Sequence, residues 1–105
     1  MKNEYGASLD RNGYAPSVLG ATNCCSLCFR TDRHLQRHEV FHGADRQKSK
    51  RYGLWINVCP ECHEKIHQRG GGTDLRLKEW AQRNAMIVYG WTKDDFRRRF
   101  RKNYV

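Results

Sequence analysis

Two identical cysteine spacings constrain the fold of this chain more than any other feature of its sequence. Cys25 and Cys28 enclose two residues, Cys59 and Cys62 enclose two residues, and 30 residues separate the pairs. Each such turn presents two thiolates on one side, and a structural zinc ion takes four ligands in a tetrahedron. One ion shared by both pairs would close the intervening chain into a loop. Because such a site forms only as the chain folds, the ion would contribute on the order of 10 kcal/mol.

Other uses of these cysteines fit the sequence less well. The N-terminal stretch has no apolar signal-peptide region, so we expect a reducing cytoplasm, where cysteines more often bind metal than form disulfides. Cys24 could pair with Cys28, but Cys25 repeats the spacing of the second pair, and the role of Cys24 stays open. A C2H2 finger that used His34 and His38 would need about 12 residues between its ligand pairs. The chain has five.

Composition supports a metal-stabilised domain with a polyanionic partner. The 105 residues suit one domain, and only 38% of them are hydrophobic, so burial alone would give a marginal fold. No run of about 18 apolar residues is present, so no membrane span is expected. The net charge of +9 and the pI near 9.7 favour a partner such as nucleic acid.

The sequence predicts an α+β fold, with a ββα unit followed by two helices. Residues 1–23 are predicted to form a flexible N-terminal segment, residues 24–70 a zinc-stapled core, and residues 71–105 a C-terminal helical extension. Pro60 suits the first position of a helix, three glycines end that helix, and Thr92 with Asp95 resembles a capping box. The predicted strands are 35–41 and 54–58, with a basic loop or short helical turn at 43–53, and the predicted helices are 60–69, 73–88 and 93–102.

Three histidines are predicted to form a second metal site. His63 and His67 are four residues apart on the predicted helix, so they project from one face. His38 lies on the first strand, which the zinc cluster would bring near that helix. A divalent ion held by these imidazoles could stabilise the leaving oxygen of a phosphodiester, and a neighbouring histidine or glutamate could accept a proton from water. Alternatively, either helix histidine replaces a cysteine on zinc; His34 is expected to be a surface residue.

Basic side chains are concentrated in two segments. One cluster lies on the last predicted helix, at residues 97–102. The other lies between the strands, and its alternative interpretation is a solvated turn. Lysine and arginine supply phosphate contacts that do not read bases. We predict phosphate binding by the cluster between the strands, which comprises Arg46, Lys48, Lys50 and Arg51.

These motifs together resemble the HNH, or His-Me finger, endonucleases, and more narrowly their small phage-encoded members. The resemblance covers most of the chain: "NGYAPSVL", "RHEVFHGADRQKSKRYGLWINVCPECHEKIH" and the tail "YGWTKDDFRRRFRKNYV", of which "CPECHEKIH" is the most specific. It implies a ββα-metal fold, a structural zinc held by two C-x2-C turns, and DNA cleavage with one divalent ion. The products would carry 5′-phosphate and 3′-hydroxyl ends, and a phage protein would act in the host cytoplasm.

When the family's metal-binding residues are matched by position to this sequence, the resemblance implies separate ligands for the structural zinc and the catalytic ion. The catalytic ion, Mg²⁺ or another divalent ion, would be bound by His38 with His63, His67 or both. The structural zinc would be bound by Cys25, Cys28, Cys59 and Cys62.

The chain departs from the family pattern at the first strand and in the middle of the motif. The family often has Asp-His or His-His on that strand, with the second residue as general base, and this chain has His38-Glu39. Either His38 binds the ion and Glu39 is the base, or His38 is the base and Glu39 lies near the metal. His42 is close enough in sequence to compete. The family's middle asparagine is missing from its usual place, and Asn57 is more simply a strand residue.

The expected function is metal-dependent hydrolysis of DNA phosphodiester bonds, without an organic cofactor and without a membrane. The alternative is a non-catalytic, zinc-stabilised nucleic-acid-binding module, which the missing asparagine keeps open. The sequence does not distinguish duplex from single-stranded DNA, DNA from RNA, or a monomer from an oligomer.

Overall fold

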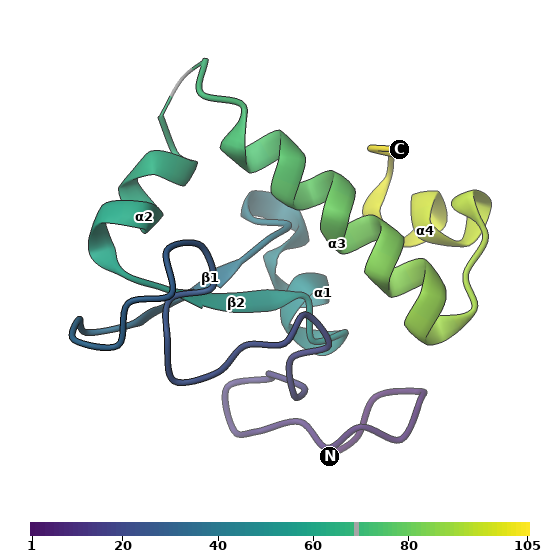
Figure 1. Cartoon of the computed structure of the whole chain (residues 1–105). Coiled ribbons are helices and arrows are strands. Elements are labelled where there is room, and N and C mark those ends of the chain that lie inside the picture. Colours follow the sequence, from purple (N-terminus) through teal and green to yellow (C-terminus); the bar gives the residue numbers. More distant parts are fainter. Residues whose placement is uncertain (69) are drawn as a thin grey trace.

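The computed structural model describes residues 1–68 and 70–105, and these form a small α+β fold (Figure 1). Strands β1 (Gln36–Glu39) and β2 (Trp55–Val58) pair antiparallel, with His38 opposite Ile56. The helices are α1 (Arg46–Arg51), which follows a 3-10 turn at Gly43–Asp45, and then α2 (Pro60–Ile66), α3 (Thr73–Tyr89) and α4 (Lys93–Phe100). No described helix is long and apolar enough to span a membrane.

The order of elements matches the prediction, and the boundaries differ at the ends. Both strands are shorter than predicted, and of the two alternatives for the basic segment, a loop or a short helical turn, the structure shows the helical one. Helix α2 ends at Ile66 instead of 69; Arg69, the end of the predicted helix, lies outside the described residues. Thr92 and Asp95 form a complete capping box at the start of α4, because aspartate can serve where the motif usually has glutamate.

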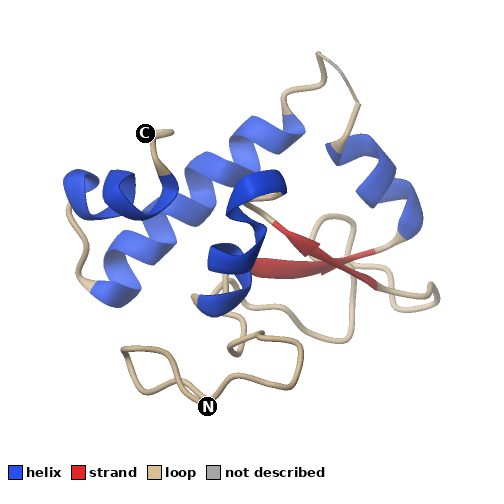
Figure 2. Ribbon diagram, turned by 180° about the vertical axis from the view of Figure 1, so that it is seen from behind, coloured by secondary structure: helices blue, strands red, loops and turns tan. Residues whose placement is uncertain are grey.

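The core joins the hairpin to the last two helices. Phe41, just after β1, packs against Phe96 and Phe100 of α4, with ring centroids 5.3 and 4.7 Å apart. Leu77, Ala81 and Ala85 line the buried side of α3, which crosses above the hairpin while α2 stands to one side of it (Figures 1 and 2). The buried apolar side chains of the strands and the residues next to them include Val40, Phe41, Leu54, Trp55, Ile56 and Val58.

The N-terminal segment lies against α1 and β2. The amide of Ala15 donates to Lys50 O, and the Trp55 indole donates to Ala15 O at 2.8 Å. Gly53 has φ +69°, and a Cβ at this position would lie 2.2 Å from Pro16 O. Only glycine therefore allows this approach of the two segments without strain. Ala15 and Pro16, which make these contacts, belong to the segment 1–23 that we predicted to be flexible; the flexibility of that segment and the boundaries at 23/24 and 70/71 stay predictions.

Tyr89→Phe is expected to make the fold less sensitive to alkaline pH. The Tyr89 hydroxyl donates to Tyr52 O, and its ring lies 4.5 Å from that of Tyr5. Burial, followed by the neighbouring Tyr5 and Tyr52, raises the pKa of Tyr89 to about 12. An unfolded tyrosine has a pKa of about 10, so above that pH the unfolded chain releases a proton that the folded chain keeps, and stability falls by roughly 1 kcal/mol at pH 11.

Urea midpoints at pH 8 and pH 11 check this. The drop between the two pH values should be smaller in Tyr89→Phe than in the wild type, whereas Tyr104→Phe, which removes a hydroxyl elsewhere in the core, should behave as the wild type. An equal drop in all three proteins would contradict the prediction.

Candidate metal centres

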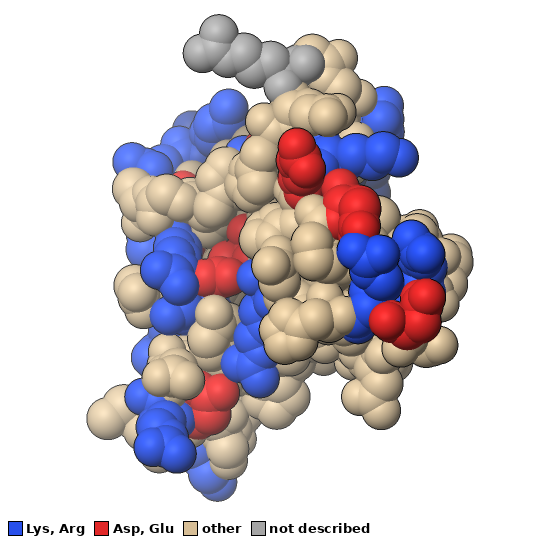
Figure 3. All heavy atoms as spheres, turned by 90° about the vertical axis from the view of Figure 1, so that its left-hand side faces the viewer, with Lys and Arg blue, Asp and Glu red and all other residues tan. Residues whose placement is uncertain are grey.

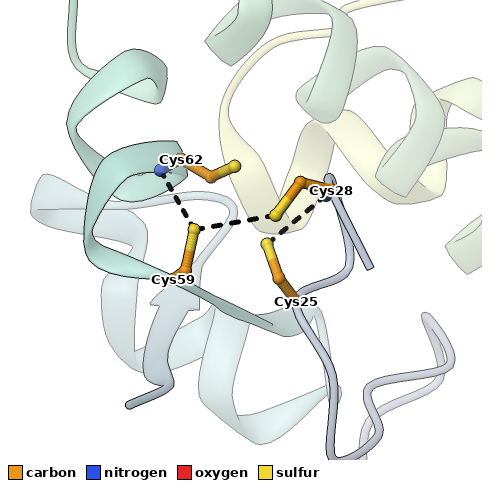
Figure 4. A group of neighbouring side chains, drawn as sticks. All are labelled: Cys25, Cys28, Cys59 and Cys62. Carbon is orange, nitrogen blue, oxygen red and sulfur yellow. Dashed lines mark hydrogen bonds between the residues drawn. The ribbon is translucent and has the colours of Figure 1, made fainter. Parts of the chain in front are cut away.

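The four predicted zinc ligands meet at the start of α2. Their sulfur atoms lie within 4.8 Å of one another and point toward a common centre in Figure 4. The Sγ atoms of Cys28 and Cys59 are 3.8 Å apart, and zinc bonds of about 2.3 Å in a tetrahedron place two sulfurs about 3.8 Å apart. Cys25, Cys59 and Cys62 are buried and Cys28 is exposed. This cluster could hold a structural metal such as zinc.

Local backbone structure positions these thiols. Cys59 is the N-cap of α2, and its Sγ accepts a hydrogen bond from the amide of Cys62 at 3.5 Å. The amide of Cys28 donates to Cys25 Sγ in the same way. The amide of Ser26 donates to the carbonyl of Asn57 on β2, so the first cysteine turn is attached to the second strand.

The electrostatics of the cluster suit a cation. Burial opposes ionisation of Cys25, but the backbone N–H groups of Cys28, Cys59 and Leu27 outweigh it and lower the pKa of Cys25 to about 6. Burial, together with the neighbouring thiols, raises the pKa of Cys62. The thiols therefore cannot all ionise easily beside one another, and a divalent cation supplies the charge that lets them do so.

Cys24 lies outside this cluster, as its spacing suggested. Its Sγ lies 3.4 Å from Thr22 Oγ1. Asn57 is a strand residue, and its side-chain amide donates to the carbonyl of Thr22 at 2.9 Å. Both residues thus help to hold the segment before the first cysteine turn.

The structure also brings together His38, His63 and His67. Their ligand nitrogens lie within 4.8 Å of one another. The ring centroid of His38 is 5.2 Å from that of His63 and 5.5 Å from that of His67. His38 is only 2% exposed, and among the described residues its buried Nε2 has no hydrogen-bond partner. An unpaired buried nitrogen is costly unless something binds it, and a divalent ion fits a site built from three imidazoles.

All three imidazoles can serve as ligands only in the neutral form, and the site favours that form for two of them. Burial, followed by the charges of His63, His67 and His42, lowers the pKa of His38 to about 4. Burial, followed by His67, lowers the pKa of His63. Because protons compete with a metal for imidazole nitrogen, these shifts leave the lone pairs available at neutral pH.

Two side chains that were not among the predicted site residues contact histidines here: one contacts His63, and the other contacts the neighbouring His42. Gln36 Oε1 lies 2.7 Å from His63 Nδ1. Asp74, at the start of α3, lies 3.1 Å from His42 Nε2 and also pairs with Lys78. The His42 ring lies 5.4 Å from that of His67, beside the three-histidine group. Gln36 shares the strand face of His38, since the two are two residues apart, and this spacing could have indicated it.

Glu39 is not a member of this three-histidine group. Neighbouring residues of a strand point to opposite faces, and the Glu39 carboxylate accepts a hydrogen bond from Arg46 Nε on α1. Burial opposes ionisation of Glu39, but this guanidinium outweighs it and lowers the pKa of the carboxyl group. The structure therefore shows Glu39 as a buried partner of α1.

The four predicted phosphate ligands all lie on α1, and each contacts another part of the protein. Lys50 is buried and lies over the Tyr14 ring. The helix joins the strands at the end of the hairpin opposite the cysteines. The remaining partners are Glu39 for Arg46, Arg99 O for Lys48, Asn12 O for Lys50 and Glu4 for Arg51. The structure does not gather these side chains around the histidines.

Acidic side chains lie among the basic ones on the surface. Figure 3 shows lysine and arginine side chains along one edge of the face that contains α2, with aspartate and glutamate between them.

Comparison of the chain with protein-family models, curated proteins and solved structures gives no match.

Proposed function

We propose that the chain is a metal-dependent endonuclease of the HNH, or His-Me finger, type, which hydrolyses DNA phosphodiester bonds. One observation carries the proposal: the buried Nε2 of the strand residue His38, which has no hydrogen-bond partner among the described residues, belongs to a group of three histidines. The other two are His63, on α2, and His67, the residue that caps the C-terminal end of α2. A hairpin and a helix that present imidazoles to one point form the arrangement expected of a ββα-metal core. In this proposal, the four-cysteine cluster binds structural zinc and holds α2 beside the hairpin.

In this proposal the three histidines bind the metal ion, and a neighbouring residue accepts the proton. A divalent ion such as Mg²⁺, held by His38, His63 and His67, would supply charge stabilisation to the departing oxygen. The low pKa of His38 favours metal binding over proton transfer, because a general base works best with a pKa near the working pH. His42, which is hydrogen-bonded to Asp74 and lies beside the group, then accepts the proton from the attacking water. Glu39, on the other strand face, stabilises α1.

The net charge of +9 supports DNA as the partner and also favours the second candidate, a zinc-stabilised nucleic-acid-binding module without catalysis. The basic side chains of α1 are engaged within the protein, so phosphate contacts by Arg46, Lys48, Lys50 and Arg51 would require exchange of their present partners. Both candidates predict salt-dependent DNA binding, and only the first predicts cleavage.

Plasmid nicking separates the two candidates. Zinc-loaded protein should convert supercoiled plasmid to open circles when Mg²⁺ or Mn²⁺ is added, and His63→Ala should slow this about 100-fold or more, because a lost ligand removes several kcal/mol of charge stabilisation. His34→Ala is the matched control, because His34 is exposed and lies outside the cluster. DNA binding in gel-shift assays without nicking under any divalent ion would favour the binding module.

A further inference from the structure

Gln36 lies on the strand that carries His38 and forms a hydrogen bond to His63 of the histidine group. It lies on β1, opposite Val58 and two residues before His38. Its side chain is exposed, and among the described residues it hydrogen-bonds only to His63. The 2.7 Å contact joins the amide oxygen, Oε1, to ring nitrogen Nδ1. The strand therefore contributes one imidazole to the group and orients another that comes from α2.

This hydrogen bond selects one form of the imidazole. An amide oxygen only accepts hydrogen bonds, so the proton of a neutral His63 must sit on Nδ1. Nε2 then carries the free lone pair, which is the atom that a cation needs. Metal-binding histidines commonly donate their other N–H to an oxygen acceptor of this kind, which fixes both the tautomer and the ring orientation.

We infer that Gln36 is a positioning residue of the divalent-ion site, which holds His63 in the Nδ1-protonated form and aims Nε2 at the site. The inference rests on the proposed function only through the existence of that ion site, and it does not depend on DNA cleavage. A purely structural role of Gln36 would lower the stability of the fold when its hydrogen bond is removed, without changing the tautomer of His63.

The test compares Mn²⁺ binding to zinc-loaded wild type, Gln36→Met and Gln36→Glu, measured by electron paramagnetic resonance of free Mn²⁺. Methionine keeps the length of the side chain and removes the amide acceptor, so Gln36→Met should weaken Mn²⁺ binding about 10- to 100-fold. Glutamate keeps the acceptor, so Gln36→Glu should bind at least as tightly as the wild type. Gln47→Met is the matched control, since Gln47 is an exposed glutamine of α1.

A second measurement reads the tautomer directly. In ¹⁵N spectra of the zinc-loaded protein without Mn²⁺, His63 should carry its proton on Nδ1 in the wild type and in Gln36→Glu, and should populate both tautomers in Gln36→Met. If the wild type binds no Mn²⁺, the ion site itself is wrong and the inference falls with it. If the wild type binds Mn²⁺ and Gln36→Met binds it within twofold with an unchanged His63 tautomer, the ion site stands and the role of Gln36 is overturned.

Discussion

Cys59→Ser is expected to unfold the core, whereas Cys24→Ser should leave it folded. Cys59 supplies one of four sulfurs within 4.8 Å of one another, and it also caps α2. Zinc in such a site contributes on the order of 10 kcal/mol, which equals or exceeds the total stability of most small domains. Loss of the ion would release α2 from the first cysteine turn and separate His63 from the strand. Cys24 contacts Thr22 outside the cluster.

Elemental analysis and circular dichroism check this expectation. The zinc content of Cys59→Ser should fall by one ion per chain relative to Cys24→Ser, with loss of helical signal and of cooperative thermal unfolding. Addition of a strong chelator should unfold the wild type in the same way. A Cys59→Ser protein that remains folded and cooperative with no zinc bound would show that the apolar core suffices and that the cysteine cluster is not the source of the fold's stability.

Local patterns predicted the two groups of possible metal ligands because each group contains a pair of residues at a short, regular spacing. The two C-x2-C turns contain the four cysteines that meet in space, and the i, i+4 spacing of His63 and His67 predicted that both imidazoles project to one side, where the structure also has His38. Pro60 and the capping residues of α4 act within one helical turn, so they too were visible in the sequence. Element ends were less certain, because tertiary contacts decide where a strand or helix stops.

Contacts between distant segments could not be predicted in the same way. Asp74 meets His42 only because the start of α3 passes over the turn after β1, and 31 residues separate them in the sequence. The basic segment was predicted to face phosphate, yet Arg46 and Arg51 find Glu39 and Glu4 in the folded chain. Such partners depend on which faces the strands and α1 present, and charge alone does not reveal this.

Substitution of the neighbouring strand residues His38 and Glu39 is expected to have different effects on nicking. His38→Ala should reduce Mg²⁺-dependent or Mn²⁺-dependent plasmid nicking about 100-fold or more, since it removes the buried nitrogen around which the group is built. Glu39→Gln should keep nicking within a few-fold of the wild type and should lower the melting temperature, because Arg46 loses its charged partner. The reason is geometric: the two side chains leave the strand on opposite faces.

Nicking rates must be compared in proteins that are folded and zinc-loaded. His67→Ala is a second variant of the same group that guards against loss of activity through unfolding. His67 is exposed, so its truncation should not disturb the core as the loss of buried His38 could, yet it removes a member of the same group. Both histidine variants should therefore lose nicking and Mn²⁺ binding together. If Glu39→Gln instead lost nicking as severely as His38→Ala while keeping Mn²⁺ binding, the carboxylate would be the base. The Glu39–Arg46 pair would then have to open during the reaction, which would give α1 a direct part in catalysis.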